Sequence, residues 1–502
     1  MRDRKATAIV FTGLWLTYVY IFPHWVDWNQ NARFDLAAAM VERGTLSIDD
    51  YRQNTGDYAL YNGHAYSDKA PGSSFLGVPI YALFSSLTRI DAVQSAIDTL
   101  GRSPAAAPTL NRPIGQVTRG EFVFAANVAL VSGLTVALPS ALLGVILFIF
   151  LGRLDYSAWT RMLATLIYGV ATPALTYSAV IYGHQLAAVM LFVAFAWLHA
   201  LRHRAGRRLE LFIVGSLLGY AVITEYPAAL IATCIGLYAI GIVRPRARLT
   251  WLIAGGAWPL LLLGAYNAAI FGSPFRFGYQ YTADPHWRAI LSTGFFSANW
   301  PTLEAAWGLT FSPFRGLFFA SPALLLAIPG LVLLRRSIYR AEWLLTLAII
   351  IGFFLLVSAS AQWWGGWSAG PRYLIPMLPF LVWPLAAAID RIEHARLSLR
   401  RWLRLIVIVM LALSIVNTWS LTAGGQYFAP DDIWNPLFDY SWPHIVAGDV
   451  ARNWGMIIGL GGVWSLLPLA LIAGATLGLS WYVTRSPGGQ RDFASHRAVD
   501  AK

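Results

Sequence analysis

Long apolar runs separated by short polar segments make up most of this chain. The first run extends from Ala6 to about Trp25, after the charged start MRDRK. Further runs begin near residues 122, 162, 184, 210, 226, 250, 316, 341, 373, 403 and 456. A helix needs about 20 apolar residues to cross the hydrocarbon of a bilayer, so the pattern predicts an all-α polytopic membrane protein with about twelve transmembrane helices. The first run is longer than a signal-peptide core and lacks a small-residue cleavage site, which favours a retained helix that starts in the cytoplasm.

One further apolar stretch, Gly72–Leu87, is short and contains Pro79. If it does not cross, the arginine clusters between helices all fall on the cytoplasmic side, among them residues 202–208 and 244–248. If it crosses, these clusters move outside, against the positive-inside rule. The stretch is therefore predicted to be a juxtamembrane or re-entrant helix, residues 72–88, which is tolerated where protein or water covers its backbone.

This topology places four loops on the outer face: residues 25–121, 272–315, 359–372 and 422–455. Residues 1–484 are predicted to form a single transmembrane domain, and residues 485–502 a disordered cytoplasmic tail. Both termini are then cytoplasmic, and the expected location is the cytoplasmic (inner) membrane.

Composition and charge agree with a membrane protein. Of the 502 residues, 57% are hydrophobic and only 12% are charged, too few to cover the surface of a soluble protein of this length. The formal net charge of +12 comes from short clusters between apolar runs, which positive cytoplasmic loops explain, so nucleic acid is not an expected partner. The single cysteine, Cys234, excludes an intramolecular disulfide.

Five polar clusters are candidates for function, because polar groups at membrane depth are costly. All five face the outside under this topology. They centre on Asp27, Arg33 and Asp35; on His64, Asp68 and Lys69 with Pro71 and Gly72; on His184 and Gln185; on Glu225; and on Arg372 and Tyr373 after the segment WWGGWSAGP. A weaker sixth candidate contains Arg276 and Tyr279 and could simply cap a helix.

Each cluster also has a structural reading. The acids near Asp27 could cap an interfacial helix, Lys69 could lie in a turn and extend its amine to water, and a histidine at a helix junction is often structural. Glu225 lies among apolar residues and needs a partner, either an arginine or a ligand. Arginine pairs with phosphate in a bidentate manner, and the glycines before Arg372 allow close backbone approach.

The arrangement resembles the GT-C class of integral-membrane glycosyltransferases, in the branch of protein O-mannosyltransferases and the aminoarabinose transferases that modify lipid A. Arg33-Phe34 looks like the Arg-Tyr of that branch, and the segment Asp68–Gly72 looks like its D-K-P-P element. The segments YNAAIFGSPFRFGY, GLTFSPFRGLFFASP and GGWSAGPRYLIPMLP look like those of bacterial membrane glycosyltransferases. One departure is that the acidic pair of the family falls on Gln30 and Asn31, which cannot act as a base.

The resemblance implies transfer of a sugar from a polyprenyl-phosphate-linked donor to an acceptor hydroxyl on a glycan, lipid or protein. Asp27 or Asp35 is then the expected general base. The expected substrate-binding residues are Arg33, Asp68, Lys69, His184, Glu225, Arg372 and Tyr373. Membrane lipids are expected to surround them. Lys69 and Arg372 are expected to hold the donor phosphate, and Glu225 and His184 to orient the sugar or an arginine.

Two other functions stay open. The same charges could form the headgroup pocket of a transporter or flippase of lipid-linked sugars, which would give transport without a covalent product. The amides at positions 30 and 31 favour a third reading, a non-catalytic relative. Acid-rich loops could hold Mg²⁺ or Mn²⁺, although no ligand spacing identifies such a site.

Overall fold

The computed structural model describes residues 2–110, 116–202, 204, 206–291 and 297–485. These residues are almost entirely helical, with one two-stranded sheet. The predicted tail, residues 485–502, lies outside the described residues from position 486 onward. The predicted all-α fold of a polytopic membrane protein is confirmed.

Seven helices among the described residues are long and apolar enough to cross a bilayer. They span Arg119–Arg153 (α6, Arg119–Ser132, the π-turn Gly133–Ala137 and α7, Leu138–Arg153), α10 (Gly183–Ala200), Arg246–Phe271 (with α13, Leu249–Phe271), α18 (Arg340–Ser358), Arg372–Glu393 (with α19, Leu378–Glu393), α20 (Leu397–Ala423) and Gly462–Thr484 (with most of α23, Leu467–Arg485).

The other five predicted crossings also coincide with helices. These are α1 (Arg2–Tyr20), α8 (Ala158–Val170), α11 (Arg208–Thr224), α12 (Ala228–Ile242) and the segment Pro322–Leu334, which ends in α17 (Ala327–Leu334). Four of them are shorter than a full span, and α1 carries four charged residues at its start.

The stretch predicted to be a juxtamembrane or re-entrant helix is helical, as α3 (Gly72–Leu87), and Pro79 lies inside it. It is followed by α4 (Asp91–Gly101), and the two helices meet at a bend of 95°. The remaining short elements are α2 (Trp28–Glu42), α5 (Ala106–Thr109), α9 (Ala174–Ser178), α14 (Pro285–Leu291), α15 (Leu303–Thr310), α16 (Leu317–Ala320), α21 (Trp442–Val446), α22 (Trp454–Ile457), and the 3₁₀ and π turns Asp49–Asn54, Arg246–Arg248, Gly278–Tyr281, Pro322–Leu326, Arg372–Met377, Pro436–Ser441 and Gly462–Leu466.

A β-hairpin in the first large loop was not predicted. Its strands, β1 (Tyr58–Tyr61) and β2 (His64–Ser67), pair antiparallel and are joined by Asn62-Gly63. Both turn residues have positive φ, 51° and 84°, as the tight two-residue hairpin turn requires. The Asn-Gly pair between tyrosine-rich segments was the sequence signal for this hairpin.

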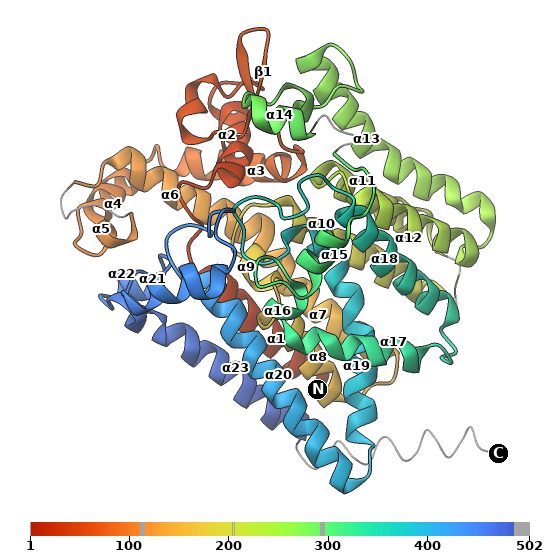
Figure 1. Ribbon diagram of the computed structural model, residues 1–502. Helices are drawn as coiled ribbons and strands as arrows, with labels where there is room; N and C mark the ends of the chain where they lie inside the picture. The colour runs from red at the N-terminus through yellow and green to blue at the C-terminus, as the bar shows by residue number, and fades with distance from the viewer. Residues whose placement is uncertain (1, 111–115, 203, 205, 292–296, 486–502) are drawn as a thin grey trace.

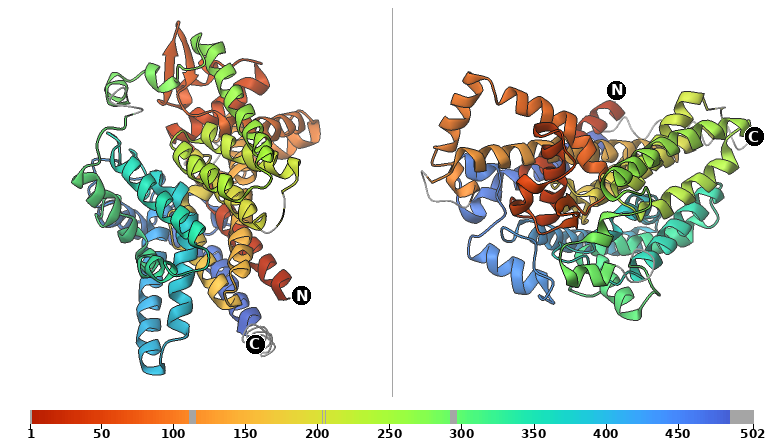
Figure 2. Two further views of the ribbon diagram at one scale, coloured as in Figure 1. Left: turned by 90° about the vertical axis from the view of Figure 1, so that its right-hand side faces the viewer. Right: turned by 90° about the horizontal axis from the view of Figure 1, so that it is seen from above.

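The four loops predicted to share one face are joined to each other. Ala59 of the hairpin bridges Thr282, Ala298 bridges Ser360, and Trp364 Nε1 donates to Asp431 Oδ2 at 3.1 Å. In Figure 1 the hairpin, α2, α3 and α14 lie at the upper end, whereas α20, α23 and the start of α1 reach the lower end. Figure 2 shows the same separation in its left view. The prediction that these loops gather on one side of the bundle is therefore confirmed.

The core lies around α7, α8, α10 and α19, whose facing side chains form the largest buried apolar cluster. On its flank, α11 and α13 pack with their backbones in contact: a Cβ on Gly215 would lie 2.0 Å from the carbonyl oxygen of Leu252. This close approach sets the position of α11, at whose end the candidate site begins.

Candidate functional site

Three segments from distant parts of the sequence meet at Glu225. This residue caps the C-terminus of α11 in an extended conformation, and Pro227 starts α12 two residues later. A Cβ on Gly183, the first residue of α10, would lie 2.3 Å from the carbonyl oxygen of Thr224 and 2.5 Å from Glu225 Oε2. A Cβ on Gly72, the first residue of α3, would lie 2.8 Å from the backbone nitrogen of Thr224. Glycine at both positions therefore allows α3 and α10 to begin against the end of α11.

Arg33 connects the first loop to Glu225. It is buried in the middle of α2 and donates through Nη1 to Ala70 O (2.9 Å) and to Ser73 Oγ (3.2 Å). Its Nε donates to Asn29 Oδ1 at 3.1 Å, and its Nη2 lies 3.7 Å from Glu225 Oε2. The structure thus brings Arg33 together with the Asp68–Gly72 segment and with Glu225, as expected.

His184 lies on the other side of the same carboxylate. Its Nδ1 is 3.2 Å from Glu225 Oε2, and its ring meets the ring of Tyr373 edge-on, with centroids 5.3 Å apart. Neither Glu225 Oε2 nor His184 Nδ1 has a hydrogen-bond partner of good geometry, although both are buried. Unsatisfied buried polar atoms are rare in folded proteins, so this pair is a candidate ligand contact.

Arg372 is a buried cation without a carboxylate partner. Its Cζ lies 5.3 Å from the ring centroid of Tyr182 and 5.4 Å from that of Tyr373. Nη1 donates to Trp367 O at 3.4 Å, Nε is buried without a hydrogen-bond partner, and no carboxylate of the described residues lies within 4.0 Å. A guanidinium that is held by aromatic faces and lacks a counter-ion is suited to bind an anion.

Asp27 lies beside this arginine. It caps the N-terminus of α2, where its Oδ1 accepts from the backbone N–H of Gln30 at 2.9 Å. Its Oδ2 accepts from the hydroxyl of Tyr182 at 2.6 Å. Burial raises the pKa of Asp27, although the Tyr182 hydroxyl, the Gln30 N–H and the charges of His24 and Arg372 act in the opposite direction.

The structure does not bring Asp35 into this group. Its side chain is fully buried within α2, with Oδ1 accepting from Asn54 Nδ2 at 3.3 Å and Oδ2 without a hydrogen-bond partner. Burial raises the pKa of Asp35 to about 8, opposed only by the Asn54 hydrogen bond. Of the two predicted bases, Asp27 is the one that contacts the other candidate residues.

Lys69 is already paired with carboxylates. Its Nζ lies 2.9 Å from Asp57 Oδ2 and 3.2 Å from Asp68 Oδ1, and it faces the ring of Tyr279. Burial lowers the pKa of Lys69, but the charges of Asp57 and Asp68 outweigh this effect and raise it to about 12. Lys69 is therefore charged, and two acids already compensate its charge.

The amides at the family's acidic positions have structural partners. Gln30 Nε2 donates to His24 O at 3.0 Å, and Asn31 Nδ2 donates to Trp25 O and to Asn54 O, both at 2.9 Å. A carboxylate has no proton for these bonds. Gln30 and Asn31 therefore use their amide N–H groups to hold the backbone that leads into α2, which explains why amides rather than acids stand at these two positions.

Two minor candidates lie outside the group. His64 is an exposed hairpin residue whose Nδ1 is 2.7 Å from Asp49 Oδ2, and Arg276 donates to Phe271 O at the end of α13. Sequence reasoning missed Tyr182 and Asp57, because a lone tyrosine or aspartate in a loop carries no spacing signal. No group of three or more His, Cys, Asp or Glu side chains in the described part of the chain could hold a metal ion, so Mg²⁺ or Mn²⁺ stays a prediction without assigned ligands.

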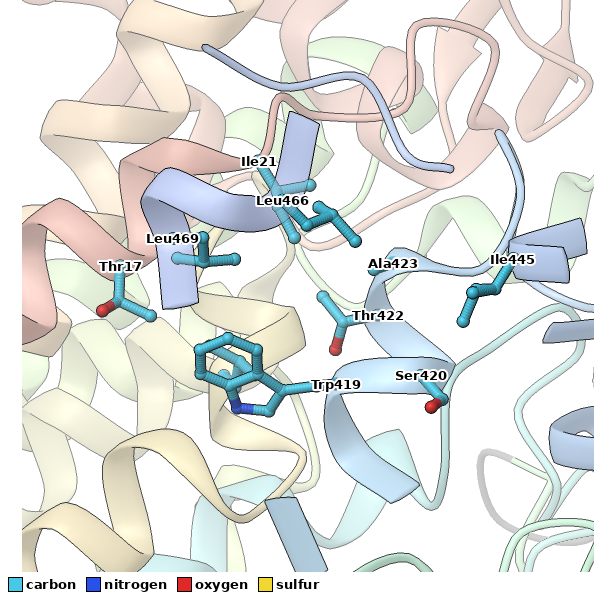
Figure 3. Close-up of a pocket in the computed structure, with 10 residues that line it drawn as sticks. Thr17, Ile21, Trp419, Ser420, Thr422, Ala423, Ile445, Leu466 and Leu469 are labelled. Atoms are coloured by element: carbon cyan, nitrogen blue, oxygen red, sulfur yellow. The ribbon is translucent and has the colours of Figure 1, made fainter. Parts of the chain in front are cut away.

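Two cavities contain none of the charged candidate residues in their lining. An apolar groove of about 130 Å³ lies between α1, α20 and the start of α23; its lining residues are Thr17, Ile21, Leu175, Trp419, Ser420, Thr422, Ala423, Ile445, Leu466 and Leu469 (Figure 3). A second cavity of about 170 Å³ is lined by Phe22–Val26 with Leu110, Gln426, Tyr427 and Arg452. It includes His24, whose carbonyl oxygen accepts from the backbone N–H of Asp27 at 3.1 Å.

No protein-family model and no curated protein matches the sequence. Among solved structures, the chain is similar to ArnT from Cupriavidus metallidurans in the apo state, with 14% sequence identity and a TM-score of 0.49 over 95% of this chain and 75% of that one. A likeness at this level carries no inference about chemistry, so the site is interpreted from its own contacts.

Proposed function

We propose that this protein is a membrane glycosyltransferase that moves a sugar from a polyprenyl-phosphate-linked donor to an acceptor hydroxyl. The observation that carries the proposal is that Tyr182 joins a carboxylate to an unpaired cation. Its hydroxyl donates to Asp27 at 2.6 Å, and its ring lies against Arg372 at 5.3 Å. A base and an anion-binding group next to each other are the two parts that sugar transfer from a phosphate requires.

In the proposed reaction, Asp27 takes the proton of the acceptor hydroxyl while the acceptor oxygen bonds to the anomeric carbon. The bond between that carbon and the phosphate oxygen breaks, and its electron pair leaves with the polyprenyl phosphate. Arg372 offsets the negative charge that grows on the phosphate. The raised pKa of Asp27 suits this role, because a more basic carboxylate accepts a proton more readily.

Glu225, His184 and Arg33 form the second part of the proposed site. Glu225 Oε2 and His184 Nδ1 are buried, lie 3.2 Å apart and lack hydrogen-bond partners of good geometry. Sugar hydroxyls both donate and accept, so they can satisfy both atoms at once. Lys69 is assigned a supporting role, because Asp57 and Asp68 already neutralise it. The site is assigned to the outer face of the cytoplasmic membrane, with both termini inside.

The test is transfer by the purified protein in lipid nanodiscs, offered a panel of polyprenyl-phosphate monosaccharides and the envelope lipids and glycans of the source cell. Release of polyprenyl phosphate and a covalent product are measured together. Asp27→Asn is expected to lower kcat by about 10²-fold or more. Asp35→Asn, in the same helix but with no contact to Tyr182 or Arg372, is the matched control and is expected to stay active.

Two results would overturn the proposal. Full activity of Asp27→Asn, of Asp35→Asn and of the double variant would remove the general-base assignment. Movement of the lipid-linked sugar across proteoliposome membranes without any covalent product would replace transfer by transport.

A further inference from the structure

A second buried arginine, Arg315, has no part in the reaction proposed above. It lies in the turn Ser312–Gly316, between α15 and α16, and is fully buried. The turn is tight: the backbone N–H of Gly316 donates to Ser312 O at 2.8 Å, and a Cβ on Gly316 would lie 2.4 Å from that oxygen. Glycine after Arg315 therefore allows the turn that directs this side chain inward.

Among the described residues, the hydrogen bonds of Arg315 all go to backbone carbonyls. Nε donates to Trp364 O at 3.2 Å and Nη2 to Gly366 O at 2.8 Å, while Nη1 donates to Phe314 O at 2.9 Å. No carboxylate of the described residues lies within ion-pair distance of it. The guanidinium thus bridges the carbonyls on either side of Gly365 with two different nitrogens, a planar fork that the single nitrogen of a lysine does not reproduce.

Gly365 is also the residue that lies against Arg372. Gly365 and Gly366 both have positive φ, 75° and 64°, and a Cβ on Gly365 would lie 3.0 Å from Arg372 Nε. The next residue, Trp367, accepts from Arg372 Nη1 at 3.4 Å. One short turn, residues 364–367, is therefore held by Arg315 from one side and contacts Arg372 on the other.

We propose that Arg315 is a positioning residue for anion binding: by bridging Trp364 O and Gly366 O it keeps the Gly365 turn against Arg372 and so fixes the orientation in which the Arg372 guanidinium meets the donor phosphate. This inference rests on the proposed function. It assigns to the segment GLTFSPFRG a role that its sequence did not indicate. Arg315 is assigned no contact with the phosphate, because each of its three nitrogens donates to a backbone oxygen.

The experiment compares Arg315→Lys, Arg372→Lys and the wild type. Polyprenyl phosphate is titrated into the purified protein in detergent, and binding is followed by native mass spectrometry; KM for the donor and kcat are measured in parallel. Arg315→Lys keeps the buried charge and loses the bridge, so donor KM and the dissociation constant are expected to rise about 10-fold, with kcat changing less than 3-fold. Hydrogen exchange is expected to increase in residues 362–370 only.

Arg276→Lys is the matched control, because Arg276 also donates to a backbone carbonyl, Phe271 O, but lies outside the site. It is expected to bind and turn over like the wild type. Equal donor binding by Arg315→Lys and the wild type, with binding lost in Arg372→Lys, would overturn the positioning role while the proposed function stands. Failure of the wild type itself to bind polyprenyl phosphate would instead reject the proposed function.

Discussion

The hydroxyl of Tyr182 donates a hydrogen bond of 2.6 Å to Asp27 Oδ2, across 155 positions of sequence. Tyr182 is the N-cap of α10 and Asp27 the N-cap of α2, so the bond joins the N-terminus of a buried helix to the N-terminus of the helix that follows α1. Because Arg372 packs on the same tyrosine ring, the geometry of Asp27 relative to the anion site depends on this contact.

Tyr182→Phe is expected to change the pH dependence of transfer. The hydrogen bond from Tyr182 lowers the pKa of Asp27 against the effect of burial, so its loss raises that pKa further. A general base works only when deprotonated, and the acid limb of the kcat/KM profile should therefore move to higher pH. The profile of Tyr177→Phe is the comparison, since the hydroxyl of Tyr177 accepts from Ala369 N and not from a carboxylate. An unmoved acid limb in Tyr182→Phe would argue against Asp27 as the titrating group.

Asp35→Asn is expected to stabilise the protein at alkaline pH. The pKa of Asp35 is about 8 in the folded protein against an ordinary value of 3.8, so the folded state holds a proton that the unfolded state loses. Stability contributed by this group is present below about pH 4 and falls as pH rises toward 8. The neutral asparagine has no such dependence. Thermal unfolding in detergent should give equal midpoints near pH 4 and a higher midpoint for the variant at pH 8.5; a lower midpoint at pH 8.5 would contradict the assignment.

Introducing an acid at position 31 is expected to damage the fold. In Asn31→Asp, a carboxylate oxygen replaces the Nδ2 that now donates to Trp25 O and Asn54 O, and three acceptors then face each other. The loss should be about 3 kcal/mol, seen as a lower unfolding midpoint at pH 7. Asn29→Asp is the matched control, one helical turn before Arg33. Asn29 Oδ1 accepts a hydrogen bond from Arg33 Nε, and a carboxylate oxygen can accept the same bond. That variant is expected to keep the wild-type midpoint.

Glu342 is expected to be the most important carboxylate for stability outside the site. It is buried at the start of α18, and its Oε1 accepts from Arg202 Nη1 (2.8 Å) and from the hydroxyl of Tyr238 (2.6 Å), with His199 Nδ1 at 3.3 Å. Glu342→Gln leaves the Arg202 charge without its partner and should cost about 3 kcal/mol. Glu393→Gln breaks the more exposed pair with Arg404 and should cost less than about 1 kcal/mol. Similar unfolding midpoints for the two variants would show that burial of the Glu342 pair does not matter.

The apolar runs and arginine clusters of the sequence allowed the helices to be predicted, together with the side of the bundle on which the four loops lie. Apolar length identifies a helix long enough to span, so the helix Gly72–Leu87 could be predicted without long-range information. The arginine clusters predicted that the four loops share one face. The same reasoning selected Arg33, His184, Glu225 and Arg372, because each is a costly polar group among apolar residues. All four lie together in the structure.

Which of these groups is free, and which is already paired, was decided only by the tertiary structure. Lys69 and Arg372 look equally suited to phosphate in sequence, but only folding places Asp57 and Asp68 against Lys69 and leaves Arg372 against tyrosine rings. Asp27 and Asp35 were likewise indistinguishable, until packing put Asp27 on Tyr182 and enclosed Asp35 next to Asn54. Residue type and hydropathy are local properties, whereas a charge's counter-ion and solvent exposure depend on residues brought near from distant parts of the chain.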